Sequence, residues 1–322
     1  MSINKKIISL LLVAIALSSC SQEEKTRKTI FILLDGIPAD VLENTATPFL
    51  DEIASKGGYT RAYVGGEKGG ASESPTVSAV GYNHLLTGTW ANKHNVYGNG
   101  IKAPNYDYWS IFKVAENHNS ELKTAIFSTW LDNRTKLIGE GLEGTDYLQL
   151  DFSFDGFEHD TVRFPHDEER QYIKNIDELV ANKTAEYLAA QGPDLSWVYL
   201  EFTDDMGHRF GDSPQMTEAV KLADDQVGRI WKAIQKRETE NNEEWMIVIT
   251  TDHGRTADTG KGHGGQSDRE RTTWIVCNQN ELKPSYYDQP GVVDIMPSIA
   301  QFMGFEMPDK IKNQLDGKSF LK

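Results

Sequence analysis

Short apolar runs of strand character alternate along this chain with segments of helical character. The strand-like runs cover residues 28–34, 59–64, 123–128, 195–202, 245–250 and 271–277. The helical segments cover residues 47–56, 106–118, 169–191, 215–235 and 292–303. Strands that alternate with helices are typical of a mainly parallel sheet with helices on both faces. We therefore predict an α/β fold, a three-layer α/β/α sandwich with a mainly parallel central sheet.

An aspartate stands at the end of three of the predicted strands. Asp35 follows the first run, Asp204 the fourth and Asp252 the fifth. In parallel α/β sheets, ligands bind beyond the carboxyl ends of the strands. We therefore expect the three carboxylates to face one site.

Three histidines accompany these carboxylates. His208 follows Asp204 closely enough for both side chains to hold one metal ion, and His253 directly follows Asp252. His263 lies in a loop between glycines, with little steric bulk beside it. Mixed oxygen and nitrogen ligands suit Zn²⁺, with Mn²⁺ and Fe as weaker alternatives. The sequence thus offers a complete ligand set for a metal centre.

The segment 74–88 predicts a nucleophile on the first turn of a helix. Pro75 ends a stretch rich in Gly and Ser, apolar residues then recur at helical spacing, and Gly88 supplies a stop signal. Ser78 would lie where backbone N–H groups are unpaired and the helix dipole is positive, which favours both an alkoxide and a bound phosphate. A serine at this position can also serve merely as an N-cap.

Taken in order, these residues resemble the alkaline phosphatase superfamily, and within it most closely the type I phosphodiesterases and nucleotide pyrophosphatases. The resemblance covers about residues 28–322. It is carried by Asp35-Gly36, Ser78, Asn99, Asp204-x-x-Gly-His208, Asp252-His253-Gly254, Gly262-His263-Gly264 and, more loosely, by Leu315-Asp316-Gly317-Lys318-Ser319.

The resemblance implies a site with two zinc ions. One ion would be held by Asp204, His208 and His263. The other would be held by Asp35, Asp252 and His253, and it would also contact Ser78. The implied activity is hydrolysis of phosphate esters through a phosphoseryl intermediate, with Ser78 as nucleophile and Asn99 as a phosphate-binding group. Thr76 is the alternative nucleophile.

Some residues depart from the family pattern. Nucleotide pyrophosphatases of eukaryotes attack with Thr, whereas this chain offers Ser78, and Val80-Gly81 replaces their Pro-Asn. The substrate implied is a small-molecule phosphate ester. A phosphodiester is favoured, and these departures weaken the case for a nucleotide. A phosphomonoesterase remains the alternative, with Lys93 and Arg255 as the nearest basic candidates for the phosphate. A sulfatase is disfavoured because residues 78–82 lack the required Pro and Arg, and a non-catalytic surface binding lipoprotein is the rival from another class.

The N-terminus resembles a bacterial lipoprotein signal. Lys5 and Lys6 precede a short apolar run, and residues 1–19 read as a signal peptide. The run ends in Leu17-Ser18-Ser19-Cys20, which is similar to a lipobox and implies lipid attachment at Cys20. Residues 20–27 would form a tether, and the protein would sit in the bacterial cell envelope, held to the membrane only by that lipid and facing the periplasm or the cell surface.

The remainder is expected to form one catalytic domain over residues 28–322. The formal net charge of −15 argues against nucleic-acid binding through a basic face. Residues 130–168 are acidic and aromatic and lack a clean period, so we predict a small inserted lid, with a long surface loop as the alternative. Aromatic side chains there would suit a hydrophobic or nucleoside leaving group; they are Trp130, Phe152, Phe154, Phe157 and Phe164. His84 and His94 are expected to be structural.

Overall fold

The computed structural model describes residues 24–322. The predicted signal peptide 1–19 and the predicted lipidation site Cys20 lie outside the described residues. The first strand begins at Thr26 and pairs there with Glu243, so the end of the expected tether 20–27 is already part of the sheet. Among the described residues, no helix is both long enough and apolar enough to cross a bilayer.

One seven-stranded sheet forms the centre of the molecule, in the order β2-β7-β6-β1-β5-β3-β4. Strands β6, β1, β5, β3 and β4 are mutually parallel, and β7 runs antiparallel to both β6 and β2. The strands are β1 (Thr26–Leu34), β2 (Gly58–Tyr63), β3 (Thr124–Ser128), β4 (Phe152–Phe154), β5 (Leu195–Leu200), β6 (Glu243–Thr250) and β7 (Thr272–Cys277). The mainly parallel sheet is therefore confirmed, with one strand reversed near an edge.

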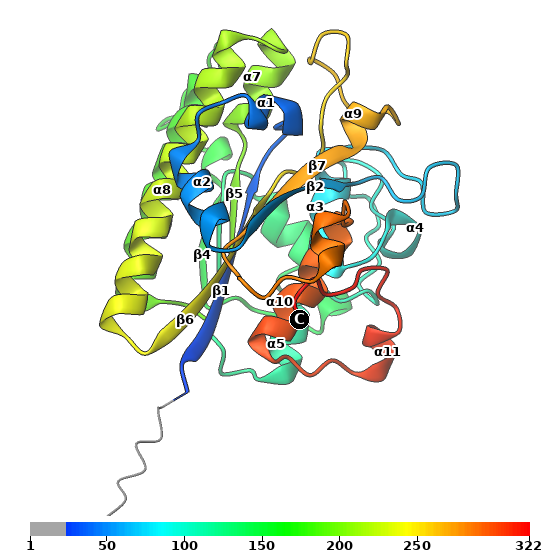
Figure 1. The fold of residues 1–322 in the computed structure, drawn as a ribbon, viewed down its shortest axis with the longest axis vertical. Coiled ribbons are helices and arrows are strands. Elements are labelled where there is room, and N and C mark those ends of the chain that lie inside the picture. The colour runs from blue at the N-terminus through cyan, green and yellow to red at the C-terminus, as the bar shows by residue number, and fades with distance from the viewer. Residues whose placement is uncertain (1–23) are drawn as a thin grey trace, which may run out of the picture.

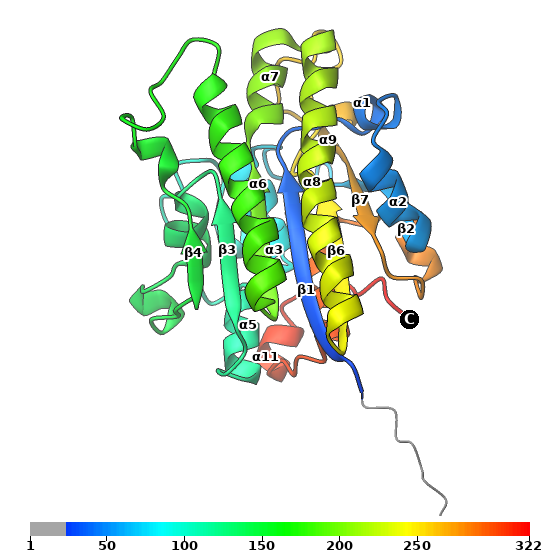
Figure 2. The same cartoon turned by 90° about the vertical axis from the view of Figure 1, so that its left-hand side faces the viewer.

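Helices cover both faces of this sheet, as the views in Figures 1 and 2 show. One face carries α1 (Ala39–Glu43), α2 (Pro48–Lys56), α6 (Gln171–Gln191), α7 (Phe202–Phe210) and α8 (Pro214–Glu240). The other carries α3 (Ser78–Thr87), α5 (Ile111–His118) and α10 (Ile295–Met303). The short helices α4, α9 and α11 span Ala91–His94, Asp268–Arg271 and Asp309–Lys312. The three-layer sandwich is confirmed.

Strand β1 shows why two cores form. Ile30, Ile32 and Leu34 enter the core beneath α6 and α8, whereas Phe31 and Leu33 enter the core beneath α3 and α10. Successive side chains point to opposite faces of a strand, so a strand covered on both sides reads as a continuous apolar run.

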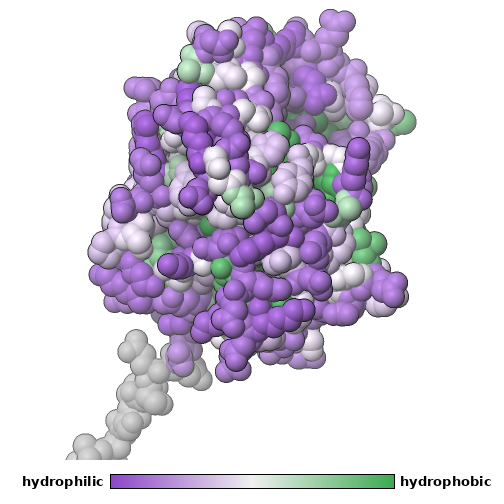
Figure 3. Space-filling model, turned by 90° about the vertical axis from the view of Figure 1, so that its right-hand side faces the viewer, coloured by the Kyte–Doolittle hydropathy of each residue, from purple (hydrophilic) through white to green (hydrophobic). Residues whose placement is uncertain are grey.

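The outer surface in the view of Figure 3 is mainly hydrophilic, with apolar residues only scattered over it.

Several predicted boundaries were wrong. The helix expected over 215–235 runs on to Glu240. The helix expected over 106–118 begins only at Ile111, because Ser110 caps it by accepting a hydrogen bond from the backbone N–H of Lys113. The strand expected over 195–202 ends at Leu200, and α7 begins at Phe202. Residues 202–210 thus form a helix that the sequence reading did not anticipate.

The segment 130–168 is built partly into the sheet. It supplies β4, which pairs in parallel with β3 at the sheet edge. Its remaining regular structure is a π-helical turn (Asn133–Ile138) and two 3₁₀ turns (Glu143–Thr145 and Phe157–His159). Four of the five aromatics singled out from its sequence pack against the core beneath α6 and α8, and Trp130 alone of those five lines the cavity described below.

Candidate active site

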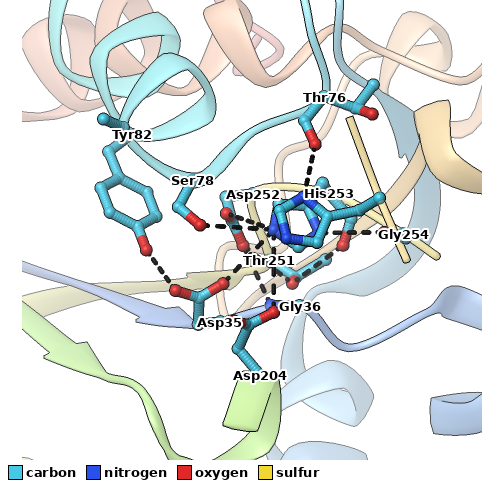
Figure 4. A network of polar contacts seen from close by, with 12 residues as sticks. Asp35, Gly36, Thr76, Ser78, Tyr82, Asp204, Thr251, Asp252, His253 and Gly254 are labelled. Atoms are coloured by element: carbon cyan, nitrogen blue, oxygen red, sulfur yellow. Dashed lines mark hydrogen bonds and ion pairs between the residues drawn. The ribbon is translucent and has the colours of Figure 1, made fainter. Parts of the chain in front are cut away.

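The site lies at the carboxyl ends of β1, β5 and β6, which are neighbours in the sheet. Asp35 directly follows β1, Asp252 follows β6 after one residue, and Asp204 lies in the first turn of α7, which follows β5. Figure 4 shows the three carboxylates converging on His253 from these separate elements. The sheet topology therefore brings together the residues that the sequence placed at strand ends.

Asp35, Asp252 and His253 form one candidate metal-binding group, with ligand atoms within 4.8 Å of one another. Nε2 of His253 lies 3.2 Å from a carboxylate oxygen of Asp252 and 3.6 Å from Oδ1 of Asp35. Oδ1 of Asp35 and Oδ2 of Asp252 are buried without a hydrogen-bond partner. Buried polar atoms are normally paired, so these two oxygens and the imidazole nitrogen fit a bound cation.

The pKa values of the two carboxylates in this group also indicate a site for a cation. Burial, together with the neighbouring Asp252 and Asp204, raises the pKa of Asp35 well above its ordinary value. Burial also raises the pKa of Asp252 to about 7, with repulsion from Asp204 adding to it. Carboxylates crowded into a buried site repel one another, and a divalent cation between them removes that repulsion.

The other oxygen of each carboxylate is fixed by the fold. Oδ2 of Asp35 accepts hydrogen bonds from the phenols of Tyr199, at 2.6 Å, and of Tyr82. Oδ1 of Asp252 accepts the backbone N–H of Gly36 at 3.0 Å. Such contacts orient metal ligands and hold their free atoms toward the ion.

A second group lies beside the first. Asp204, His253 and His263 also place ligand atoms within 4.8 Å of one another. His208 stands four residues after Asp204 on α7, and its Nε2 lies 3.2 Å from Oδ2 of Asp204 and 3.0 Å from Nε2 of His263. Side chains at this helical spacing share one face. All three residues predicted for the second ion are therefore within reach of one cation.

The imidazoles of His253, which is buried, and His263, which is partly buried, are oriented through their Nδ1 atoms. Nδ1 of His253 lies 2.9 Å from the carbonyl of Gly254, and Nδ1 of His263 lies 2.9 Å from the carbonyl of Thr76. An Nδ1–H that donates to a carbonyl leaves Nε2 unprotonated and free to bind metal. Burial lowers the pKa of both rings, which also favours the neutral form that ligates.

Ser78 is the first residue of α3 and is 6% exposed. Its Oγ lies 3.4 Å from Nε2 of His253, and it faces the carboxylates in Figure 4. The backbone N–H of the next residue, Ala79, donates to Oδ1 of Asn99 at 3.0 Å, so Asn99 is held at the same helix end. The position of the predicted nucleophile at a helix N-terminus is thus confirmed.

The alternative nucleophile, Thr76, is engaged elsewhere. Its hydroxyl donates to the carbonyl of Gly265 at 2.9 Å and accepts the N–H of Gly264 at 3.0 Å. Its own carbonyl faces His263. Thr76 therefore anchors the loop that carries His263.

The two basic candidates for the phosphate are also engaged. Lys93 donates to the carbonyl of Gln314 at 2.7 Å and to Asp316 at 2.6 Å. Arg255 is 1% exposed and donates to the carbonyl of Gly36 at 2.9 Å and to the side chain of Asp204. Lys93 is a structural cation, and Arg255 orients a predicted metal ligand.

Two glycines permit the close packing of this site. A Cβ on Gly81 of α3 would lie 2.6 Å from the carbonyl oxygen of Asp252, and a Cβ on Gly207 would lie 2.2 Å from the guanidinium of Arg255. Any larger residue would push α3 away from Asp252, or Arg255 away from α7. The Gly81 that departs from the family pattern therefore has a packing role here.

A cavity of about 220 Å³ opens over these groups. It is lined by Asp35, Ser78, Tyr82, Asn99, Trp130, Tyr199, Glu201 and Asp204. The sequence reading did not single out Tyr82, Tyr199 or Glu201. Tyr82 could have been found, because it lies one helical turn after Ser78 on the same face of α3.

Comparison with known proteins agrees with this arrangement. A family model described as type I phosphodiesterase / nucleotide pyrophosphatase matches residues 29–263. A venom phosphodiesterase of Naja atra is 24% identical over 279 residues, which cover 84% of this chain and 29% of that protein. A venom phosphodiesterase of Crotalus durissus collilineatus is 22% identical over 267 residues, covering 80% and 28% respectively. The chain thus spans less than a third of the length of these curated relatives.

Solved structures share the fold. The murine ectonucleotide pyrophosphatase / phosphodiesterase 5, as an inactive variant in complex with AMP, superposes with a TM-score of 0.59 at 13% identity, covering 88% of this chain and 96% of that chain. The phosphonate monoester hydrolase of Agrobacterium radiobacter gives a TM-score of 0.60 at 14% identity, covering 91% and 76%. Identities this low speak for the architecture alone.

Proposed function

This chain belongs to the type I phosphodiesterase / nucleotide pyrophosphatase family, and on that basis we propose that it hydrolyses phosphodiesters with Ser78 as nucleophile. The observation that carries the proposal is the convergence of six candidate metal-ligand side chains and one serine hydroxyl at the ends of three adjacent strands.

The family is metal-dependent, and the ligand chemistry suggests zinc. Carboxylate oxygens together with neutral imidazoles are the ligands of catalytic zinc sites, and the two unpartnered oxygens of Asp35 and Asp252 support the fit. We assign Asp35, Asp252 and His253 to one ion, and Asp204, His208 and His263 to the other. When bound, such ions supply Lewis-acid stabilisation of the charge that develops during phosphoryl transfer.

The chain's own groups account for the remaining steps. Oγ of Ser78 bonds to phosphorus while the bond to the leaving oxygen breaks. The serine proton is lost to solvent, and the leaving oxygen keeps the bonding pair and takes a proton from solvent to become the alcohol. Water then breaks the bond between phosphorus and Oγ, which releases the phosphate product and restores the hydroxyl. Oδ1 of Asn99 is tied to Ala79, so its amide nitrogen remains to donate to a non-bridging oxygen.

A diester suits the cavity better than a monoester. Among the described residues, the lining of the cavity includes no Lys or Arg, and the guanidinium groups that contact lining residues are already paired, Arg255 with Asp204 and Arg170 with Glu201 and Asp205. A monoester dianion carries one more negative charge than a diester and needs additional positive groups. The phosphomonoesterase alternative is therefore the weaker candidate.

The decisive experiment compares Ser78→Ala with the wild type on bis-p-nitrophenyl phosphate. Loss of the nucleophile should lower kcat by about a thousandfold or more while the zinc content stays near two ions per chain. Ser72→Ala is the matched control, because that hydroxyl only accepts the backbone N–H of Glu67 in the preceding loop. A wild-type rate in Ser78→Ala removes the nucleophile assignment. A wild type that binds zinc but cleaves no phosphate ester favours the binding-lipoprotein alternative.

The N-terminal sequence supports a further part of the proposal, a lipid anchor at Cys20 in the cell envelope. Thr26 opens β1 at one end of the strand and Asp35 follows its other end, so the site would face away from an anchored N-terminus, as the path of β1 in Figure 1 suggests. Incorporation of labelled palmitate in the bacterial host, lost in Cys20→Ala, tests this. Labelling that persists in Cys20→Ala contradicts it.

A further inference from the structure

Two loop segments meet beside the candidate active site. The segment 64–77 leads from β2 to Ser78, and the segment 263–271 leads from His263 to β7. Strands β2 and β7 are paired antiparallel, with the last residue of β2 opposite the first residue of β7, so the two segments lie side by side where they join the sheet. A contact between them therefore connects the predicted nucleophile to a predicted metal ligand.

The side chain of Gln266 bridges the two segments. Its Nε2 donates to the carbonyl of Ser74 at 2.7 Å, and its Oε1 accepts from the guanidinium of Arg271 at 2.6 Å. Arginine has only donors, so the atom of Gln266 that faces Arg271 must be the oxygen. The amide nitrogen is then left to face Ser74, and the reversed amide would place donor against donor and acceptor against acceptor. The orientation of Gln266 is therefore fixed.

Arg271 is itself held by the chain that leaves β2. Its guanidinium donates to the carbonyl of Gly65 at 3.0 Å and to that of Gly66. These two residues have φ values of 86° and 71°, which glycine adopts without strain. Arg271 thus has two backbone acceptors in addition to Gln266, and it holds the amide in place.

Ser74 is the residue through which this contact reaches the nucleophile helix. It is 2% exposed, and its Oγ lies 3.4 Å from Nε2 of His84 on α3. Pro75 follows it with a fixed φ, and Ser78 comes three residues later. A displacement of the Ser74 carbonyl is therefore passed to Ser78 over a short stretch of chain.

Thr76 supplies a second attachment of the same segment, through its contacts with the loop that carries His263. One attachment fixes a point of the segment, whereas two also fix its direction. Among residues 24–322, Gln266 is the donor that pairs with the carbonyl of Ser74. A buried carbonyl is costly to leave unpaired, so loss of this donor favours a shift of the segment.

From these contacts we infer that Gln266 is a positioning residue, whose amide aligns the hydroxyl of Ser78 for attack on phosphorus. The inference rests on the proposed function, because it requires Ser78 to be the nucleophile. Misplacement of a reacting group by about 1 Å costs about a hundredfold in rate, so a smaller shift should cost about tenfold. The loss should fall on kcat, because the hydrogen bonds of Gln266 go to Ser74 and Arg271 and not to the groups that bind substrate.

The test uses two variants of Gln266 on bis-p-nitrophenyl phosphate. Gln266→Met keeps the length of the side chain but removes both polar atoms, and it should lower kcat about tenfold, with KM and the zinc content unchanged. Gln266→Glu keeps the acceptor for Arg271 but sets a carboxylate oxygen against the carbonyl of Ser74, so it should lose at least as much. Gln149→Met is the matched control, because Nε2 of Gln149 also donates to a backbone carbonyl, at 3.2 Å, but at the amino end of β4, away from the site.

Inhibition constants separate positioning of Ser78 from a general distortion of the site. Orthovanadate bonds to a serine oxygen in the geometry of the transition state, whereas inorganic phosphate binds without that bond. Gln266→Met should raise the inhibition constant of orthovanadate about tenfold, in parallel with its loss of kcat, and leave that of phosphate unchanged.

A wild-type kcat in either variant of Gln266, a tenfold loss in Gln149→Met, or an equal rise in both inhibition constants would overturn the inference while leaving the phosphodiesterase intact. A wild type that cleaves no phosphate ester, or that keeps its rate in Ser78→Ala, would instead point to failure of the proposed function.

Discussion

Replacement of Asp252 by Asn should stabilise the metal-free protein, although it removes a predicted metal ligand. In the metal-free fold, burial raises the pKa of Asp252 to about 7 from an ordinary value of 3.8. The folded state therefore retains a proton that the unfolded chain releases. The resulting loss of stability is absent below about pH 4, grows as the pH rises, and is complete above about pH 7.

The size of the effect follows from the difference between the two pKa values. It corresponds to about 4 kcal/mol at pH 8 and falls to about 2 kcal/mol at pH 5. These figures are upper limits, because Asp35 is crowded into the same site and shares the repulsion. Asparagine avoids the penalty, since its carbonyl oxygen can still accept the N–H of Gly36 and its amide carries no charge.

The assay is chemical denaturation in the presence of a chelator, at pH 8 and at pH 5. At pH 8, metal-free Asp252→Asn should have a higher free energy of unfolding than the metal-free wild type. Its melting temperature in a parallel thermal scan should be up to about 8 °C higher. Both differences should shrink at pH 5. With zinc restored, the wild type should be the more stable of the two proteins, because the variant has lost a metal ligand. Asp268→Asn, at a side chain that is 97% exposed, is the charge control. The reasoning is refuted if Asp252→Asn is no more stable than wild type at pH 8, or if its advantage does not depend on pH.

Three further predictions concern the residues around the metal ligands. Thr76→Val removes the hydroxyl that holds Gly264 and Gly265, so zinc affinity in a chelator competition should fall about tenfold; an unchanged affinity would show that the loop needs no anchor. Tyr82→Phe with Tyr199→Phe frees Oδ2 of Asp35 and should weaken zinc binding by about 10–100-fold, and retention of both ions at wild-type affinity would contradict the role given to the phenols. Lys93→Ala should lower stability by about 1 kcal/mol through its lost partner Asp316, with kcat/KM unchanged; a large loss of kcat/KM would return Lys93 to the phosphate site.

The ligand set could be predicted because its signals are local. An aspartate after a buried strand, a histidine four residues after an aspartate, and a serine at a helix start can each be read from a short stretch of chain. In a parallel sheet the carboxyl ends of neighbouring strands lie at the same edge, so the residues that follow those strands come together. For this reason the six ligand candidates and Ser78 converge even though Asp35 and His263 are far apart in the sequence.

The positions of the other site residues depend on strand register and on side-chain packing, and the periodicity of a sequence reveals neither. Tyr199 reaches Asp35 because β5 pairs with β1 so that Leu33 lies opposite Tyr199. The reversal of β7 has no local signature, since an apolar run reads the same in either direction. The sequence offered Arg255 as a basic candidate for the phosphate, yet the missing Cβ of Gly207 admits its guanidinium beside α7, where it meets Asp204.

The packing of the segment 130–168 could not be predicted from its composition. Its composition predicts a lid, and that role stays a prediction. Most of its aromatic residues serve the core, because β4 extends the sheet and Phe152 stacks on Tyr187 of α6 with ring centroids 3.9 Å apart. Composition alone could not separate aromatics that pack inward from the single one, Trp130, that lines the cavity.

The most direct test of the two metal sites and of Ser78 as nucleophile is a crystal structure of the zinc-loaded protein with orthovanadate, from diffraction data recorded at the zinc absorption edge. The account predicts two anomalous peaks, one among Asp35, Asp252 and His253 and one among Asp204, His208 and His263. It also predicts that the vanadium atom is bonded to Oγ of Ser78. A single peak, or vanadate attached to any other side chain, would contradict it.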